Sequence, residues 1–256
     1  GLRLITARGK LMEGLPVGGG MAAVMAAAEQ VTPYLREGVV IAAENGPSNT
    51  VLSGSQMVLN VMLAKLEEQG IQTKKLKVSH AFHSPLMEPV LEDFDDLAQR
   101  MSYSSPSIEI ISTVTGKVIS QNHDWPRYWT NHIQQPVKFW QGIECLSARG
   151  YDMVLENGPK PVLSAMGQGC LPNWQGQWLP SLRPNRYDTR NDRRVMLASL
   201  GKLYVSGANI TWPDKAGKRV DLPTYPFQRE RYWIDIEKGD RQQKAGIVSK
   251  ASQTSG

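Results

Sequence analysis

A histidine at the end of a predicted strand is the clearest candidate for chemistry in this chain. Residues 78–89 alternate like a strand as far as His83 and then continue as an acidic amphipathic helix. A histidine at such a junction can exchange protons with a group bound in a cleft, because its unperturbed pKa lies close to neutral pH. A lone histidine after a strand is more often structural than catalytic, so His83 by itself does not identify an enzyme.

A nucleophile for this base is not evident in the sequence. A serine elbow of the form Gly-X-Ser-X-Gly does not occur in the 256 residues, although such an elbow is a common partner of a catalytic histidine. Cys145 and Cys170 have no cysteine or histidine at metal-ligand spacing, so they are interpreted as reduced structural thiols. We therefore expect the chain to hold only part of an active site.

The first half of the chain predicts a helix at 2–13 and then a small α/β unit. A strand at 21–27, a helix at 29–36, strands at 39–44 and 50–54, a helix at 55–69 and a final strand follow in the order β-α-β-β-α-β. This order is typical of a ferredoxin-like fold. In the 55–69 segment the apolar residues recur at helical spacing, at Met57, Val58, Val61, Met62 and Leu66.

The second half predicts alternating helices and strands, which is typical of a parallel sheet. Helices are expected at 86–103, 125–134, 138–149 and around 196–204, with strands at 108–114 and 151–155. The acidic side of the 86–103 helix is interpreted as a solvated face rather than a carboxylate site. Beyond residue 237 the sequence has no hydrophobic periodicity and predicts a disordered tail or linker.

Composition and charge exclude several classes of protein. The formal net charge is +5, from 29 basic and 24 acidic residues, and the clearest basic excess lies at 183–194. That excess could favour an anionic partner, but aromatic residues do not alternate with it as in single-stranded nucleic-acid binders. No apolar run is long enough for a membrane span, and no signal peptide is recognisable. We expect a cytoplasmic protein that binds neither nucleic acid nor membrane.

Several motifs in order along the chain closely resemble the acyltransferase domain of modular type I polyketide synthases. The resemblance continues through a segment similar to the linker that follows these domains, and it covers roughly residues 1–236. The motifs are Ala7 to Met12, Asn45-Gly46-Pro47 with Ser53-Gly54, His80 to Met87, Tyr128-Trp129 with Pro136-Val137, Glu156 to Pro159 before Pro161-Val162-Leu163, and Leu222 to Trp233.

This resemblance implies an α/β-hydrolase-like large subdomain, incomplete at its N-terminus, with an inserted ferredoxin-like small subdomain. The expected boundaries are 1–17 and 82–183 for the large subdomain, 18–81 for the small subdomain, 184–236 for the linker and 237–256 for the tail. In the family, a serine elbow lies upstream of the arginine that Arg8 matches. The serine is therefore expected before residue 1, and the fragment alone is expected to be inactive.

The resemblance also implies roles for individual residues. His83 would be the general base, and the backbone carbonyl of His132 would orient its imidazole, although His132 could equally be a half-buried helix histidine. Arg8 would hold the free carboxylate of a malonyl substrate in a bidentate pair, where the structural alternative is a surface arginine.

Three further residues are expected near the substrate. Phe82, within His80-Ala81-Phe82-His83, would select malonyl over methylmalonyl, because its ring would fill the space that an α-methyl branch needs; it could also be a core aromatic between the subdomains. His80 is counted with the substrate-binding residues. Asn45 would lie near the substrate channel or simply form an Asn-Gly turn.

The expected reaction transfers a malonyl unit from malonyl-CoA, through an acyl-serine, to the phosphopantetheine arm of an acyl carrier protein. No bound cofactor or metal is expected, since the coenzyme A thioester is a substrate. An adjacent ketosynthase domain would contact the 184–236 linker. Two alternatives remain open: a free-standing malonyl-CoA:acyl carrier protein transacylase, and a non-catalytic docking or scaffold module that retains the fold.

Overall fold

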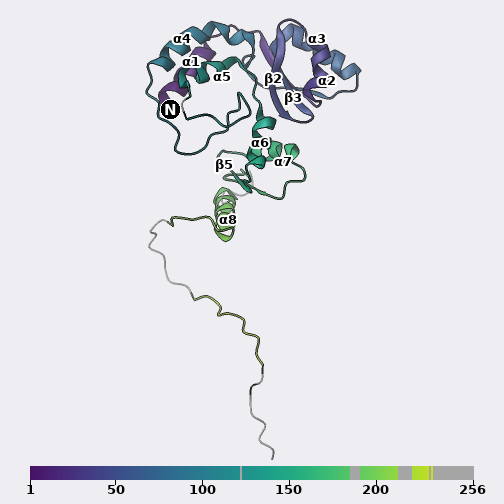
Figure 1. Cartoon of the computed structure of the whole chain (residues 1–256). Helices are drawn as coiled ribbons and strands as arrows, with labels where there is room; N and C mark the ends of the chain where they lie inside the picture. Colours follow the sequence, from purple (N-terminus) through teal and green to yellow (C-terminus); the bar gives the residue numbers. More distant parts are fainter. Residues whose placement is uncertain (122, 185–190, 213–220, 231, 233–256) are drawn as a thin grey trace, which may run out of the picture. The chain divides into compact units, whose positions relative to one another are not determined.

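The computed structural model describes residues 1–121, 123–184, 191–212, 221–230 and 232 (Figure 1). The chain divides into two compact units, Gly1–Ile210 and Thr211–Gly256. The predicted tail at 237–256 lies outside the described residues. The subdomain boundaries predicted inside 1–210 stay predictions, but α8 (Asn191–Val205) belongs to the first unit and packs against β6 (Gln177–Pro180).

The ferredoxin-like arrangement is confirmed. Strands β1 (Gly19–Val24), β2 (Val39–Gly46), β3 (Asn49–Ser55) and β4 (Thr73–Lys75) form a four-stranded sheet in the order β2-β3-β1-β4, with every neighbouring pair antiparallel. Helix α2 (Ala28–Val31) and a 3₁₀ turn (Thr32–Tyr34) replace the single helix predicted at 29–36, because Pro33 cannot donate the backbone hydrogen bond that a longer α-helix needs.

The two faces of this sheet have different coverings. Helix α3 (Gln56–Glu68) packs on one face through its buried residues Leu59, Met62, Leu63 and Leu66. The apolar face predicted for this helix was therefore only partly right, since Met57 and Val61 are 76% and 55% exposed. On the opposite face, Met21, Ala42, Ala43 and Val51 cluster with Leu76, Phe82 and Val137.

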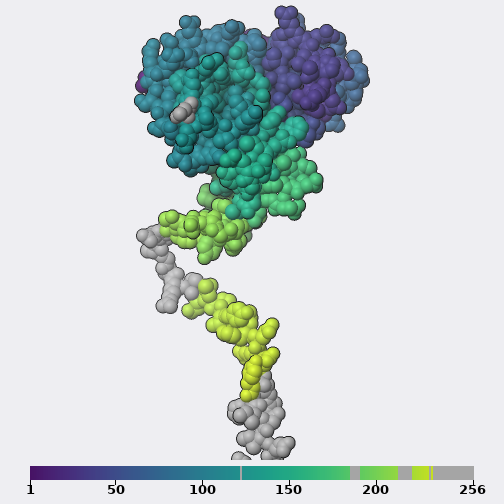
Figure 2. Space-filling model, viewed as in Figure 1, coloured from purple at the N-terminus to yellow at the C-terminus, as the bar shows by residue number. Residues whose placement is uncertain are grey.

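The remainder of the first unit is mainly helical. Helix α1 (Leu2–Glu13), a 3₁₀ helix (Pro85–Val90), α4 (Leu91–Gln99) and α5 (Trp125–Gln134) share one apolar cluster. Helices α1, α4 and α5 lie beside the small sheet in Figure 1, and in Figure 2 the blue and teal atoms of this region border the purple atoms of the small sheet. The helix predicted from residue 86 thus begins as a 3₁₀ segment, since Pro89 inside it has no N–H to donate to an α-helical hydrogen bond.

A second sheet, of two strands, follows α5 along the chain. Helices α6 (Phe139–Ala148) and α7 (Val162–Cys170) flank strand β5 (Met153–Glu156), which pairs in parallel with β6. The strand predicted at 108–114 is wrong: only Ile111 forms an isolated bridge, to Val118, and Ile108 is 78% exposed. Strand β6 was not predicted from the sequence, because its four residues are too few to show a recognisable alternation of apolar and polar side chains.

Candidate active site

His83 lies in a tight turn whose backbone is unusual. Its φ is 56°, and it is the one non-glycine residue with positive φ in the described part of the chain. The following Ser84 stabilises the turn, because its buried hydroxyl donates to Ala81 O at 2.6 Å and accepts from Leu86 N at 3.3 Å. Such a conformation costs about 1 kcal/mol or more and is concentrated at functional sites.

The imidazole of His83 is oriented by a backbone carbonyl. Its Nδ1 lies 2.9 Å from Gln135 O, and a carbonyl can only accept, so Nδ1 carries the proton. In the neutral ring, Nε2 is then unprotonated and can accept a proton. The prediction that the carbonyl of His132 orients His83 is wrong, because the carbonyl of Gln135 does so.

The sequence contained a signal for Gln135. A residue before proline is pushed out of the helical region, and Gln135 has φ −70° and ψ 149° at the end of α5. After it, Val137 leaves the helix and pairs with the edge of β2, donating to Ala42 O at 2.8 Å and accepting from Glu44 N at 2.9 Å. Pro136 therefore releases the preceding carbonyl from the helix and turns it toward His83.

Arg8 and His132 meet on one side of His83. Arg8 Nη1 lies 3.0 Å from His132 Nδ1, and the rings of His83 and His132 are 6.0 Å apart between centroids. The apolar cluster of α1, α4 and α5 brings these two helices together: Leu4 and Leu11 pack in it on either side of Arg8, and Ile133 packs in it next to His132. The structure thus brings together three of the residues predicted for the site.

Burial and charge keep both histidines neutral near pH 7. Burial lowers the pKa of His83, and the Arg8 charge lowers it further, whereas the hydrogen bond to Gln135 raises it. Burial, the Arg8 charge and the neighbouring His83 lower the pKa of His132 to about 4. His83 is therefore in its proton-accepting form at neutral pH.

Phe82 packs between two apolar clusters of the first unit. It contacts the cluster of α1, α4 and α5 as well as the cluster of Met21, Ala42, Ala43 and Val51 on the small sheet. These contacts agree with the alternative of a core aromatic, and the role of Phe82 in substrate selection stays a prediction.

The His80 side chain is held by contacts within the protein and is not open to a ligand. It is buried, with Nε2 3.0 Å from Leu15 O and Nδ1 2.9 Å from Ser79 Oγ. Both ring nitrogens thus contact the protein itself, which argues against direct substrate binding. The contact with Leu15 ties the segment before His83 to the connection between α1 and β1.

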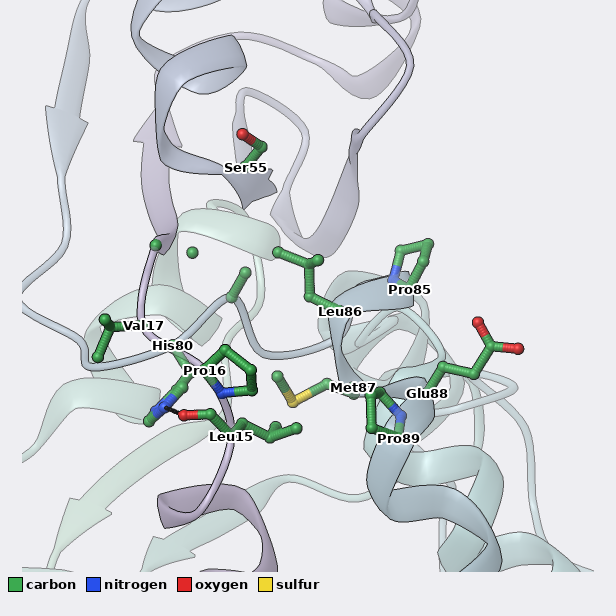
Figure 3. Close-up of a pocket in the computed structure, with 13 residues that line it drawn as sticks. Leu15, Pro16, Val17, Ser55, His80, Pro85, Leu86, Met87, Glu88 and Pro89 are labelled. Atoms are coloured by element: carbon green, nitrogen blue, oxygen red, sulfur yellow. Dashed lines mark hydrogen bonds between the residues drawn. The ribbon is translucent and has the colours of Figure 1, made fainter.

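A pocket of about 480 Å³ lies beside His80. Figure 3 shows its apolar walls, with Met87 and Pro16 at the centre and the Glu88 carboxylate at the edge, directed away from His80. A second pocket, also of about 480 Å³, is lined by residues of α6, β5 and α7. Arg8, His83 and His132 line neither of these two pockets, so the charged site is separate from both.

Asn45 is not joined to the other predicted site residues. It lies half-buried in β2, and its backbone carbonyl accepts a hydrogen bond from Cys170 Sγ at 3.1 Å. No hydrogen bond, ion pair or ring contact within the described ranges links Asn45 to Arg8, His83 or His132. Burial raises the pKa of Cys170 to about 11, so this thiol stays protonated.

Among the described residues, no helix combines the length and the apolar character of a membrane span. Histidine, cysteine, aspartate and glutamate side chains in the described ranges nowhere gather in groups of three or more that could hold a metal ion.

The chain is similar to polyketide synthases and to solved acyltransferase structures. It is 37% identical over 240 residues to polyketide synthase GfsA of Streptomyces halstedii, covering 91% of this chain and 3% of that protein. It is also similar to the solved acyltransferase domain from the second module of the salinomycin polyketide synthase, with 38% identity and a TM-score of 0.79, covering 88% of this chain and 54% of that one.

A further solved relative is the malonyl CoA-acyl carrier protein transacylase of Clostridium perfringens. The identity is 27% and the TM-score 0.72, covering 80% of this chain and 64% of that one. The chain thus spans about half the length of the salinomycin domain and a small part of GfsA. These neighbours share the mixed α/β fold predicted for the chain.

Residues 1–210 match the family model described as "Acyl transferase domain". This match covers the whole first unit, including Arg8, His83 and His132. The chain therefore belongs to the acyl transferase domain family, and its relatives include the acyltransferase domains of polyketide synthases.

Proposed function

We propose that this chain supplies the general base and the carboxylate-binding arginine of a malonyl-selective acyltransferase domain in a polyketide synthase. The observation that carries the proposal is the state of Arg8. It is half-buried, and within the described residues no carboxylate forms an ion pair with it. A half-buried guanidinium without a carboxylate partner favours an incoming anion. Arg8 contacts His132, and the ring of His132 lies beside that of the proposed base His83.

The proposed acyl transfer has two steps. A serine hydroxyl attacks the thioester carbonyl of malonyl-CoA while His83 Nε2 accepts its proton; the carbon–sulfur bond then breaks, and the proton passes to the coenzyme A sulfur. In the second step the phosphopantetheine thiol of an acyl carrier protein gives its proton to His83 and attacks the acyl ester, and the serine oxygen recovers the proton. The serine would belong to a Gly-His-Ser-X-Gly elbow, which residues 1–256 do not contain.

The other components follow from the same proposal. Phe82 would exclude an α-methyl branch, and Arg8 would hold the malonyl carboxylate with the donors that it does not give to His132. An adjacent ketosynthase would contact the segment at 184–236, in a cytoplasmic multienzyme. The exposure of Tyr225 and Phe227, at 74% and 73%, supports a partner for this segment.

A free-standing malonyl-CoA:acyl carrier protein transacylase is the second candidate, and the similarity to the Clostridium perfringens enzyme supports it. The chemistry would be the same. The exposed aromatic residues of 221–232 favour the polyketide synthase, because a discrete enzyme has no ketosynthase domain for them to contact.

Acyl loading tests the proposal. In the polypeptide that carries this chain, loading from malonyl-CoA and from acetyl-CoA is measured for the wild type and for Arg8→Gln. We expect malonyl loading to fall by about 10- to 100-fold, because charge-assisted hydrogen bonds to the carboxylate are lost, while acetyl loading changes little.

Arg3→Gln is the matched control, since Arg3 is an exposed arginine on the same helix. It should leave both rates unchanged. If Arg8→Gln lowers malonyl and acetyl loading equally, or lowers neither of them, Arg8 does not bind the carboxylate and the proposal fails.

A further inference from the structure

The ring of His132 has a position that the proposed function does not use. Because arginine can only donate, the contact of 3.0 Å between Arg8 Nη1 and His132 Nδ1 requires an unprotonated Nδ1. The ring proton is then on Nε2, which faces Thr113 Oγ1 at 3.5 Å. His132 thus presents a fixed acceptor to Arg8.

Aromatic side chains hold this acceptor in place. The ring of His132 lies 6.0 Å from that of Tyr128 and 5.8 Å from that of Trp129, between centroids, and both residues are on the same helix α5. Trp129 also packs in the apolar cluster that joins α5 to α1. The imidazole therefore has little freedom to rotate away from Arg8.

A long arginine side chain has many rotamers, and ordering it costs entropy whenever it binds a ligand. One hydrogen bond to a rigid neutral acceptor removes part of that cost before binding, and it leaves the remaining guanidinium donors for an anion. A carboxylate in the place of His132 would compete with the ligand for the charge, whereas a neutral imidazole does not.

We propose that the His132 side chain positions the Arg8 guanidinium for the substrate carboxylate, so that His132 is a positioning residue of the acyltransferase site. This inference rests on the proposed function for the identity of the ligand. The Arg8–His132 contact itself is a property of the chain and can be tested without any substrate.

The substrate-free test is the ring tautomer of His132, measured by nitrogen-15 NMR on the protein at pH 7. The expected result is a protonated Nε2, an unprotonated Nδ1, and a pKa that rises in Arg8→Gln but not in Arg3→Gln. A proton on Nδ1 in the wild type, or a titration that Arg8→Gln does not alter, would overturn the inference whatever the substrate is.

The second test compares two substitutions at position 132 by the binding of malonyl-CoA and acetyl-CoA. His132→Leu removes the acceptor and should weaken malonyl-CoA binding about tenfold, equivalent to about 1.4 kcal/mol, with little effect on acetyl-CoA. His132→Asn keeps an oxygen in the place of Nδ1 and should restore most of the difference.

The outcomes separate the two proposals. If both variants fold, as judged by circular dichroism, and weaken malonyl-CoA binding equally, His132 does not position Arg8. If the wild type shows the expected tautomer but binds malonyl-CoA no better than acetyl-CoA, the malonyl function fails and the positioning of Arg8 stands.

Discussion

Phe82 shows how a packing position can suit the proposed role in selectivity. It joins two apolar clusters and directly precedes the proposed base His83. Its side chain therefore contacts apolar groups of both clusters, so a movement of the ring would disturb the packing of each. Rigidity of this kind is what a steric filter requires, since a mobile ring would accommodate an extra methyl group.

Phe82→Ser should change the preference between extender units. Removing the ring opens space for an α-methyl group, so the ratio of methylmalonyl to malonyl loading should rise by about tenfold, the scale of discrimination that one methyl group provides. Competition between the two coenzyme A thioesters measures this ratio. Phe82→Leu, which keeps most of the volume, should remain malonyl-selective, and an unchanged ratio in a folded Phe82→Ser protein would contradict the role.

At the scale of elements, a buried carboxylate organises the start of α7. Glu156 at the end of β5 is 9% exposed, and its oxygens accept from the backbone N–H groups of Val162, Leu163 and Ser164 at 3.0, 3.0 and 2.7 Å. Burial alone would raise the pKa of Glu156, but the hydrogen bonds from Ser164, Leu163 and Val162 outweigh it and hold the pKa below its usual value. The carboxylate thus caps a helix from outside that helix.

Glu156→Gln should lower the free energy of unfolding by about 1–2 kcal/mol at pH 7, the scale of a lost helix cap. Because the pKa of Glu156 is depressed in the folded state, its contribution is present above the unfolded pKa and is lost as pH falls through the folded pKa. Urea unfolding at pH 7 and pH 3 measures this difference, which should shrink at pH 3. Glu68→Gln, at an exposed glutamate of α3, should change stability by less than about 0.5 kcal/mol.

Sequence reasoning succeeded at the elements with local signals and failed where distant contacts decide. The β-α-β-β-α-β order and helix α5 could be predicted because their turns and apolar spacing are local. The exposed side of α3 could not be read from periodicity alone, since Met57 and Val61 fit a helical face as well as the residues that are buried. Likewise, Gln135 orients His83 although the two residues are 52 positions apart in the chain. In the sequence, only the proline that follows Gln135 indicated that its carbonyl would leave the helix.

At the scale of the whole molecule, the two sheets found in the described part of the first unit differ in how much apolar core covers them. The small sheet has four strands, with apolar clusters on both faces. The second sheet has two short parallel strands, and Leu155 of β5 and Leu163 of α7 beside it are 51% and 50% exposed. A two-stranded parallel sheet with open edges is marginal in water.

Amide hydrogen exchange should therefore differ between the sheets. Amides of β1 and β3 should exchange more slowly than those of β5 and β6, because opening the small sheet requires breaking a larger core. Peptide-resolved mass spectrometry of the exchange measures this directly. Equal protection of both sheets would show that they unfold together as one cooperative unit.

The left-handed backbone of His83 gives position 83 a diagnostic value for evolution. Glycine would relieve the strain there, so a lineage in which the proposed base has no role can gain stability by replacing the histidine. Histidine is thus expected to persist at this turn where selection for the proposed proton transfer continues. Among descendants of this chain, residue 83 should separate working transferases from copies that persist only as scaffolds.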